Sequence, residues 1–247
     1  HKDMGLVSEV FSKETLASLE GQMSVAHVRY STAGGSVPEN AQPLVMRYVK
    51  GVLAIAHNGN LTNAVEIRKE LEHRGAIFQT TIDSEVIAYL IARERVHSHS
   101  VEAAVSAAMK QLDGSYSLLV MSPRKLIAAR DPHGFRPLCM GKLEGSYVFA
   151  SESCALDAAG AEFVRDIEFL EFRCGFACRK NTFIVPITII FGLPSAIRSS
   201  IGKFHWSKCC YSYEAIIITG ICNGDVLAIF IDCFVRDGFG KSHIHQK

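Results

Sequence analysis

The sequence lacks an excess of charge of either sign and lacks any long apolar run. Its 247 residues carry a formal net charge of +1, which predicts no general attraction to nucleic acid or to acidic membrane surfaces. No stretch reaches the roughly 18 apolar residues of a membrane-spanning helix, because the densest one, 182–193, is short and contains Pro186. The opening residues HKDMGLVSEVF are too charged for a signal peptide. We therefore expect a cytoplasmic protein without nucleic-acid or membrane partners.

Cysteine is scarce in the first two thirds of the chain. Only Cys139 and Cys154 precede residue 170, which is typical of an enzyme from a reducing compartment. The other cysteines crowd into the remaining residues, and this change in composition predicts a boundary near 169–175. We expect one domain over 1–170 and a divergent tail over 171–247. Three interpretations of the tail stay open: a degraded continuation of the protein, an out-of-frame segment, or a new module.

Metal and phosphate motifs are weak or missing. The spacing of Cys174, Cys178, His205 and Cys209 is only loosely like that of a metal site, since structural zinc sites show closer pairs. We therefore predict no metal. The run 240–242, Gly-Lys-Ser, resembles the end of a P-loop, but a Val stands where the motif needs its first Gly. Neither HExxH nor G-x-S-x-G occurs, which removes two further catalytic signatures.

Hydrophobic periodicity predicts a layered α+β domain. We expect strands at 23–30 and 52–57, then helices at 61–73, 83–95 and 100–112, and finally short strands at 115–121, 126–129, 138–140 and 147–151. Strands, a block of helices and then strands at hairpin spacing are the order of a domain in which helices pack on sheets.

The segment AIAHNGNLTNA, 54–64, ends an apolar strand with polar residues. Asn58 offers a side-chain amide donor, and the N–H of Gly59 can be approached closely because glycine has no Cβ. Two converging donors are what an oxyanion needs. Taken alone, however, Asn-Gly is more often a tight turn.

Three other segments bear on that choice. HVRYSTAGG, 27–35, presents Arg29, and arginine binds carboxylates through two parallel hydrogen bonds. FQTTIDSEV, 78–86, places Asp83 at a helix start, where it could receive an ammonium group or serve as an N-cap. ARDPHGFRPL, 129–138, alone indicates a loop. Taken together, a carboxylate binder, an ammonium binder and an oxyanion site describe a pocket for a free α-amino acid.

These segments, with GSYSLLVM, AARDPHGFRPLCMGK and VFASESCALDAAGAEFVRDIE, resemble the glutaminase domain of the glutamine phosphoribosylpyrophosphate amidotransferases. The resemblance runs from about Gly5 to Glu168. It implies the class II, N-terminal-nucleophile fold, a four-layer αββα sandwich of two antiparallel sheets between helices, here without its first strands. It also implies a part in the first committed step of purine synthesis, in which ammonia from glutamine reacts with phosphoribosylpyrophosphate.

The resemblance assigns the amino-acid-binding residues. Arg29 would bind the glutamine α-carboxylate, and Asp83 would bind the α-ammonium group. Tyr30 and Thr32 would help to line the pocket. The segment 131–136 would shape that side of the domain without a chemical role.

The resemblance also assigns an oxyanion hole, formed by the Asn58 side chain and the Gly59 N–H. In this family the first residue is a Cys whose thiol attacks the glutamine amide, with its own α-amine as base. This chain begins at His1, which matches an interior family position, and Cys139 and Cys154 fall in later motifs. We therefore expect a truncated domain with binding residues but no nucleophile. The alternatives are an inactive glutamine-binding remnant and another class II amidotransferase, of the glucosamine-phosphate or asparagine synthetase type.

The rest of the family pattern concerns the complete enzyme. The glutaminase step needs no cofactor, whereas the complete enzyme uses Mg and, in some members, carries an iron–sulfur cluster. Phosphoribosylpyrophosphate would be bound only there, and the complete enzyme would form a homo-oligomer. Beyond residue 170 only 188–206, 214–226 and 233–246 faintly resemble the linker and phosphoribosyltransferase domain of the family.

Overall fold

A computed structural model describes residues 1–19, 21, 23–29 and 35–168, and the backbone of 172–176, 184–185 and 230–231. Two short helices, α1 (Val7–Val10) and α2 (Lys13–Ala17), begin the described chain, and a 3₁₀ turn, η1 (Pro38–Asn40), precedes the first long strands. No helix of these residues is long and apolar enough to cross a membrane.

The larger sheet has five antiparallel strands. Their order is β2 (Leu44–Tyr48), β3 (Gly51–Leu61), β4 (Gly114–Ser122), β5 (Lys125–Arg130) and β9 (Phe172–Phe176). β3 is the longest, and it pairs with β4 from Ala54 to Leu61 but with β2 only from Gly51 to Ile55. The last residues of β3 therefore have a strand neighbour on one edge only among the described residues.

The second sheet has four strands, in the order β10 (Ile184–Val185), β7 (Ser146–Ala150), β6 (Cys139–Leu143) and β8 (Glu162–Asp166). β10 runs parallel to β7, and the other neighbours are antiparallel. A separate parallel pair joins β1 (His27–Val28) to β11 (Phe230–Ile231). β6 and β7 are connected by a turn at Glu144 and Gly145, both of which have positive φ.

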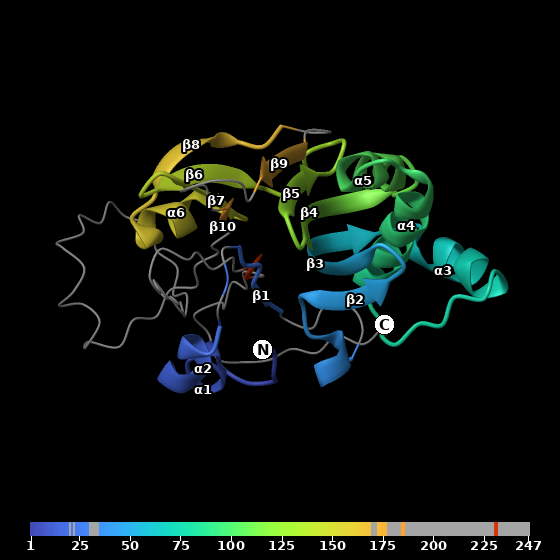
Figure 1. Ribbon diagram of the computed structural model, residues 1–247, viewed down its shortest axis with the longest axis horizontal. Helices are drawn as coiled ribbons and strands as arrows, with labels where there is room; N and C mark the ends of the chain where they lie inside the picture. Colours follow the sequence, from blue (N-terminus) through green and yellow to red (C-terminus); the bar gives the residue numbers. More distant parts are fainter. Residues whose placement is uncertain are drawn as a thin grey trace, which may run out of the picture.

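Helices cover the outer faces of both sheets (Figure 1). α3 (Ala64–His73), α4 (Asp83–His97) and α5 (Val101–Met109) pack on the five-stranded sheet around a cluster that includes Ile55, Ile91 and Leu118. A second cluster, with Ala56 and Leu119 from one sheet and Phe149 from the other, fills the space between the sheets. α6 (Ser153–Ala159) packs on the outer face of β6 and β7. The predicted αββα order of layers is confirmed.

The helices predicted at 83–95 and 100–112 are confirmed, and each buries one apolar face. In α4, Val86, Ile87, Leu90 and Ile91 are all buried, and in α5 the residues Val101, Ala104, Val105 and Ala108 are buried. α5 starts after an N-cap, Ser100, whose hydroxyl accepts a hydrogen bond from the N–H of Ala103 at 3.1 Å. α3 begins at Ala64, three residues later than expected, because β3 occupies the chain up to Leu61.

Several expectations were wrong. The strand that we expected to end at His57 continues through Asn58, Gly59 and Asn60, so the tight-turn interpretation of Asn-Gly is wrong. The cause is cross-strand pairing: Asn58 pairs with Ser117 and Gly59 with Tyr116, and this ladder outweighs the local turn preference. The strand expected at 23–30 is only His27–Val28 among the described residues.

Asp83 is not an N-cap. It is the first residue of α4, the N-cap is Ile82, and no side chain caps this helix. The expected boundary at residue 170 stays a prediction, although β9, just beyond it, completes the five-stranded sheet. The tail side chains, including those of Cys174, Cys178, His205 and Cys209, lie outside the described residues.

Candidate active site

Both candidate oxyanion residues lie in β3, and the side chain of Asn58 points into the space between the sheets. Side chains alternate along a strand, and Ala56 belongs to the cluster between the sheets. Asn58 therefore points to the inter-sheet side, where it is 7% exposed. Its Oδ1 has no hydrogen-bond partner among the described residues. A buried amide oxygen without a partner is costly, which marks Asn58 as a candidate for ligand binding.

Gly59 lies unusually close to the neighbouring strand. A Cβ at this position would be 2.0 Å from the carbonyl oxygen of Ser115 and 2.8 Å from the Cα of Tyr116. The φ angle of Gly59 is +148°, which side-chain-bearing residues rarely adopt. Only glycine fits here, so the identity of this residue is dictated by backbone packing as well as by any chemistry.

The free edge of β3 has a regular pattern of N–H groups. In an antiparallel strand, every second residue directs its N–H to the same edge. On the edge that faces β2, the His57 N–H donates to Gln42 Oε1 at 2.7 Å. The Leu61 N–H donates to Asp83 Oδ2 at 2.9 Å. Alternation directs the N–H of Gly59 to this same edge, between the two and beyond the last residue that β2 pairs with.

His57 lies on the opposite side of β3 from Asn58, against the start of α4. Its Nδ1 is 3.1 Å from Ser84 Oγ and 3.5 Å from Asp83 Oδ1. The Gln42 side chain holds the backbone of His57: it accepts from the His57 N–H and donates to the His57 carbonyl oxygen at 3.2 Å. His57, the residue before Asn58, is thus fixed by both its side chain and its backbone.

Asp83 keeps a negative charge in this environment. Burial acts to raise the pKa of its carboxyl group, but the hydrogen bond and charge of His57, together with the N–H groups of Leu61 and Ser84, outweigh burial and lower that pKa. Its side chain is 17% exposed. An ionised and partly accessible carboxylate at this place is suited to an ammonium group, and its role as a ligand for glutamine stays a prediction.

Arg29 is connected to the start of α4 through one carbonyl group. Its Nη1 donates to the Gly35 carbonyl oxygen at 3.2 Å, and Asn40 Nδ2 donates to the same oxygen at 2.8 Å. Asn40 also bonds Thr81: its Nδ2 donates to the Thr81 hydroxyl at 3.0 Å, and its Oδ1 accepts from the Thr81 N–H at 3.1 Å. Arg29 and Asp83 therefore belong to one hydrogen-bonded framework. Tyr30 and Thr32 lie outside the described residues.

Asn40 and Gln42 are the residues that the sequence analysis missed. Both are buried, with 0% and 7% exposure. The signal that could have found them is a pair of amide residues in the polar stretch just before Pro43 and the alternating strand LVMRY. Side-chain amides that replace missing strand or turn partners are not detectable from periodicity alone.

Two other buried carboxylates organise loops. Asp131 accepts hydrogen bonds from the N–H groups of Tyr116, His133, Phe135 and Arg136, at 2.9 to 3.3 Å. Its oxygens are thereby occupied, in line with the shaping role expected for 131–136. Glu85 similarly accepts from the N–H groups of Gln79 and Thr80, which fixes the loop before α4.

The described cysteines are unsuited to nucleophilic attack. Cys139 is buried under α6, on the side of β6 away from the other sheet. Burial, with help from Asp166, raises the pKa of its thiol to about 12. Burial and Glu152 raise the pKa of the Cys154 thiol to about 11. Thiolates, not thiols, are the nucleophiles.

The αββα layers define a domain of the class II, N-terminal-nucleophile amidotransferase type. A family model described as "Glutamine amidotransferase domain" matches residues 27–158, more than half of the chain, and the chain belongs to this family. The matched range contains the four described candidate residues Arg29, Asn58, Gly59 and Asp83.

Individual proteins and solved structures are also similar to this chain. An amidophosphoribosyltransferase of Methanocaldococcus jannaschii is 50% identical over 168 residues, 68% of this chain and 36% of that protein. A solved structure described as the allosteric regulatory enzyme of purine biosynthesis superposes with a TM-score of 0.58 at 43% identity, over 61% of this chain and 32% of that one. The glutamine phosphoribosylpyrophosphate amidotransferase of Bacillus subtilis, solved with ADP and GMP, gives 0.55 at 39% identity over the same shares. The chain spans about a third of the length of the curated relatives it matches.

Proposed function

We propose that this chain carries the glutamine-binding and oxyanion-stabilising part of the glutaminase half of an amidophosphoribosyltransferase. The observation that carries the proposal is the free edge of β3. There the N–H groups on either side of Gly59 are held by Gln42 and Asp83, and the Gly59 N–H lies between them. This arrangement fits an oxyanion donor held rigidly in place, which is the arrangement that stabilises charge in a transition state.

In the proposed reaction a cysteine thiolate attacks the side-chain amide carbon of glutamine. The carbonyl π electrons move to oxygen, and the oxyanion is held by Asn58 Nδ2 and the Gly59 N–H. The α-amine of the same cysteine, which has taken the thiol proton, passes that proton to the amide nitrogen, so that the C–N bond breaks, ammonia leaves and a thioester remains. Water then attacks the thioester, through a second oxyanion at the same place, and releases glutamate and the thiol. Arg29 and Asp83 bind the two charged groups on Cα and so fix the amide against the donors.

The attacking thiol is proposed to come from outside the described residues, because burial has raised the pKa of both Cys139 and Cys154. The same fact keeps a second candidate function open: the polypeptide of residues 1–247 would bind glutamine without releasing ammonia. The N-terminal residue of the protein isolated from its natural source separates the two, since an N-terminal Cys supports hydrolysis and any other first residue supports binding alone.

In the complete enzyme the proposal includes a second reaction, which uses the ammonia. There the ammonia would displace pyrophosphate from phosphoribosylpyrophosphate in purine synthesis, in a cytoplasmic homo-oligomer. Free cysteines are in keeping with a reducing compartment. Among the described residues no group of three His, Cys, Asp or Glu side chains could hold a metal ion. Mg and an iron–sulfur cluster stay expectations for the complete enzyme.

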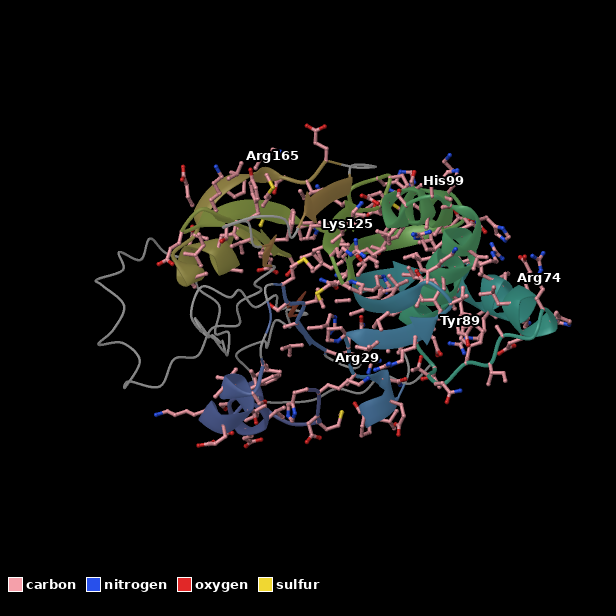
Figure 2. All side chains as sticks on the ribbon, in the orientation of Figure 1. Arg29, Arg74, Tyr89, His99, Lys125 and Arg165 are labelled. Carbon is pink, nitrogen blue, oxygen red and sulfur yellow. The ribbon has the colours of Figure 1, made fainter. Side chains whose placement is uncertain are left out.

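The test is titration of the polypeptide of residues 1–247 with L-glutamine in a calorimeter. We expect binding that weakens at least about tenfold in Arg29→Gln, since loss of a bidentate carboxylate contact is worth 1.4 kcal/mol or more. Arg74→Gln is the matched control, because Arg74 pairs with Glu70 on the exposed face of α3 (Figure 2). Equal affinity of Arg29→Gln and the unsubstituted chain would show that Arg29 does not bind the carboxylate. No binding at all would contradict the proposed function.

A further inference from the structure

Two buried amide side chains lie two positions apart: Asn40 is the last residue of η1, and Gln42 lies between η1 and β2. The hydrogen-bond partners of both side chains are Gly35, Thr81 and His57, and not Asn58 or Gly59. Each bonds instead to a segment that carries one end of the candidate site. Buried polar side chains with complete hydrogen bonds specify a single arrangement of the segments they join, so the question is which arrangement this pair specifies.

Gln42 takes the place of a missing strand partner. The register of β2 on β3, with Leu44 opposite Ile55, places Gln42 opposite His57. Backbone pairing stops at Leu44, and Pro43 has no N–H to continue it. The Gln42 amide continues the ladder through its side chain, accepting from the His57 N–H at 2.7 Å and donating to the His57 carbonyl oxygen at 3.2 Å. It therefore holds the edge of β3 immediately before Asn58.

Asn40 joins the two segments that carry the charged-group binders. Its Nδ2 donates to the Gly35 carbonyl oxygen, which also accepts from Arg29. Both its amide atoms bond Thr81, two residues before Asp83. A guanidinium group has five N–H donors in a fixed fork, so the bond from Arg29 to the Gly35 carbonyl oxygen helps to fix the plane of that fork.

We propose that Asn40 and Gln42 are positioning residues with separate tasks. Asn40 sets the distance between the carboxylate binder Arg29 and the ammonium binder Asp83. Gln42 sets the place of the Asn58 and Gly59 donors that face the side-chain amide of glutamine. This inference rests on the proposed function. It assigns the α-carboxylate and α-ammonium end of glutamine to Asn40 and the side-chain amide end to Gln42.

The experiment uses two ligands with the polypeptide of residues 1–247. L-Glutamine engages both ends of the site, whereas L-norvaline has the same α-carboxylate, α-ammonium group and side-chain carbons but no amide. We expect Asn40→Leu to weaken both ligands by a similar factor of about ten, because each uses Arg29 and Asp83. We expect Gln42→Met to weaken L-glutamine about fivefold or more and to leave L-norvaline within about twofold, because it disturbs the amide end alone. The readout is the ratio of the two dissociation constants, which a general loss of stability does not change.

Two further variants complete the design. Gln42→Glu keeps an acceptor for the His57 N–H but loses the donor to the His57 carbonyl oxygen. Its ratio of dissociation constants should therefore lie between those of the unsubstituted chain and Gln42→Met. This variant replaces Gln42→Met if Gln42→Met does not fold. Gln111→Met is the matched control, because Gln111 bonds Glu94 and Ala107 at the end of α5. We expect it to bind both ligands normally.

The outcomes are distinct. Parallel losses for both ligands in the Gln42 variants, or unchanged binding in all variants, would overturn the inference while the proposed function stands. Failure of the unsubstituted chain to bind L-glutamine would overturn the proposed function and this inference with it. A changed ratio in the Gln42 variants, with parallel losses in Asn40→Leu, is the result that we expect.

Discussion

Asp83 accepts a hydrogen bond from the backbone N–H of Leu61 at 2.9 Å, two residues beyond Gly59. One carboxylate thus joins the start of α4 to the free edge of β3. Its other oxygen lies 3.5 Å from His57 Nδ1. Asp83 therefore has a structural task whether or not it binds an ammonium group, and the two tasks must be separated by experiment.

Asp83→Asn separates them, because asparagine keeps an oxygen for the Leu61 N–H but has no charge. We expect L-glutamine to bind about tenfold more weakly or worse, since charge-assisted hydrogen bonds are about twice as strong as neutral ones. Glutaramic acid, which lacks the α-ammonium group, should bind both proteins equally in the same calorimetric titration. If glutaramic acid also loses affinity, Asp83 acts only through the position of β3. Asp113→Asn, at an exposed acid, is the matched control.

Gly59→Ala should be severely destabilising. An alanine there combines a positive φ with a Cβ 2.0 Å from a backbone oxygen, which no side-chain rotation relieves. We expect a loss of about 3 kcal/mol or more in the free energy of unfolding, or an insoluble protein. Gly75→Ala is the control, since Gly75 also has a positive φ but nothing within 4 Å of its Cβ position. It should cost only about 1 kcal/mol. Equal losses in urea unfolding would mean that the close approach at Gly59 relaxes easily.

Local signals made most of the helices and turns predictable. The apolar stripes of α4 and α5 and the turns at 123–124, 131–134 and 144–145 follow from periodicity and from proline and glycine. β2 could also have been predicted, because alternation along LVMRY places Leu44, Met46 and Tyr48 on one face of a strand. α6 carries a stop signal in Gly160, which has a φ of +71°. The substrate-binding roles of Arg29, Asp83, Asn58 and Gly59 stay predictions that rest on family resemblance.

The remaining errors have one physical origin, which is pairing between distant residues. The continuation of β3 through Asn58 and Gly59 depends on Ser117 and Tyr116, more than fifty positions later. The roles of Asn40 and Gln42 depend on Thr81 and His57. A local pattern shows what a segment prefers when it is alone, whereas these segments are held by partners that only the folded chain supplies.

Stability should fall in mild acid because of His27. Burial lowers the pKa of His27 to about 3, and the charges of His57 and Arg29 act in the same direction, against an opposing hydrogen bond. In the unfolded chain the pKa returns to about 6.5, so between pH 6.5 and 3 the unfolded state binds more protons and the free energy of unfolding decreases as the pH falls. Above pH 6.5 this contribution is complete and constant.

Urea unfolding at a series of pH values measures this slope. His27→Gln cannot titrate, so its unfolding free energy should depend less on pH between 6.5 and 4 than that of the unsubstituted chain. His99→Gln is the control, since His99 is exposed on the outer surface near α5 (Figure 2), and its slope should be unchanged. Identical slopes for His27→Gln and the unsubstituted chain would show that His27 is accessible to protons in the folded protein.

The thiols of Cys139 and Cys154 should be slow to react in the folded protein. Cys139 is 2% exposed and donates to the Ala150 carbonyl oxygen at 3.3 Å, and its pKa is raised to about 12. Only the thiolate is alkylated readily, so at pH 8 iodoacetamide should leave Cys139 unmodified and should label Cys154, half-buried with a pKa of about 11, slowly. Mass spectrometry of the separate tryptic peptides measures each site. Both should be fully labelled in urea. If Cys139 were labelled rapidly in the folded protein and protected by L-glutamine, it would lie in the ligand site, and the nucleophile would not have to come from elsewhere.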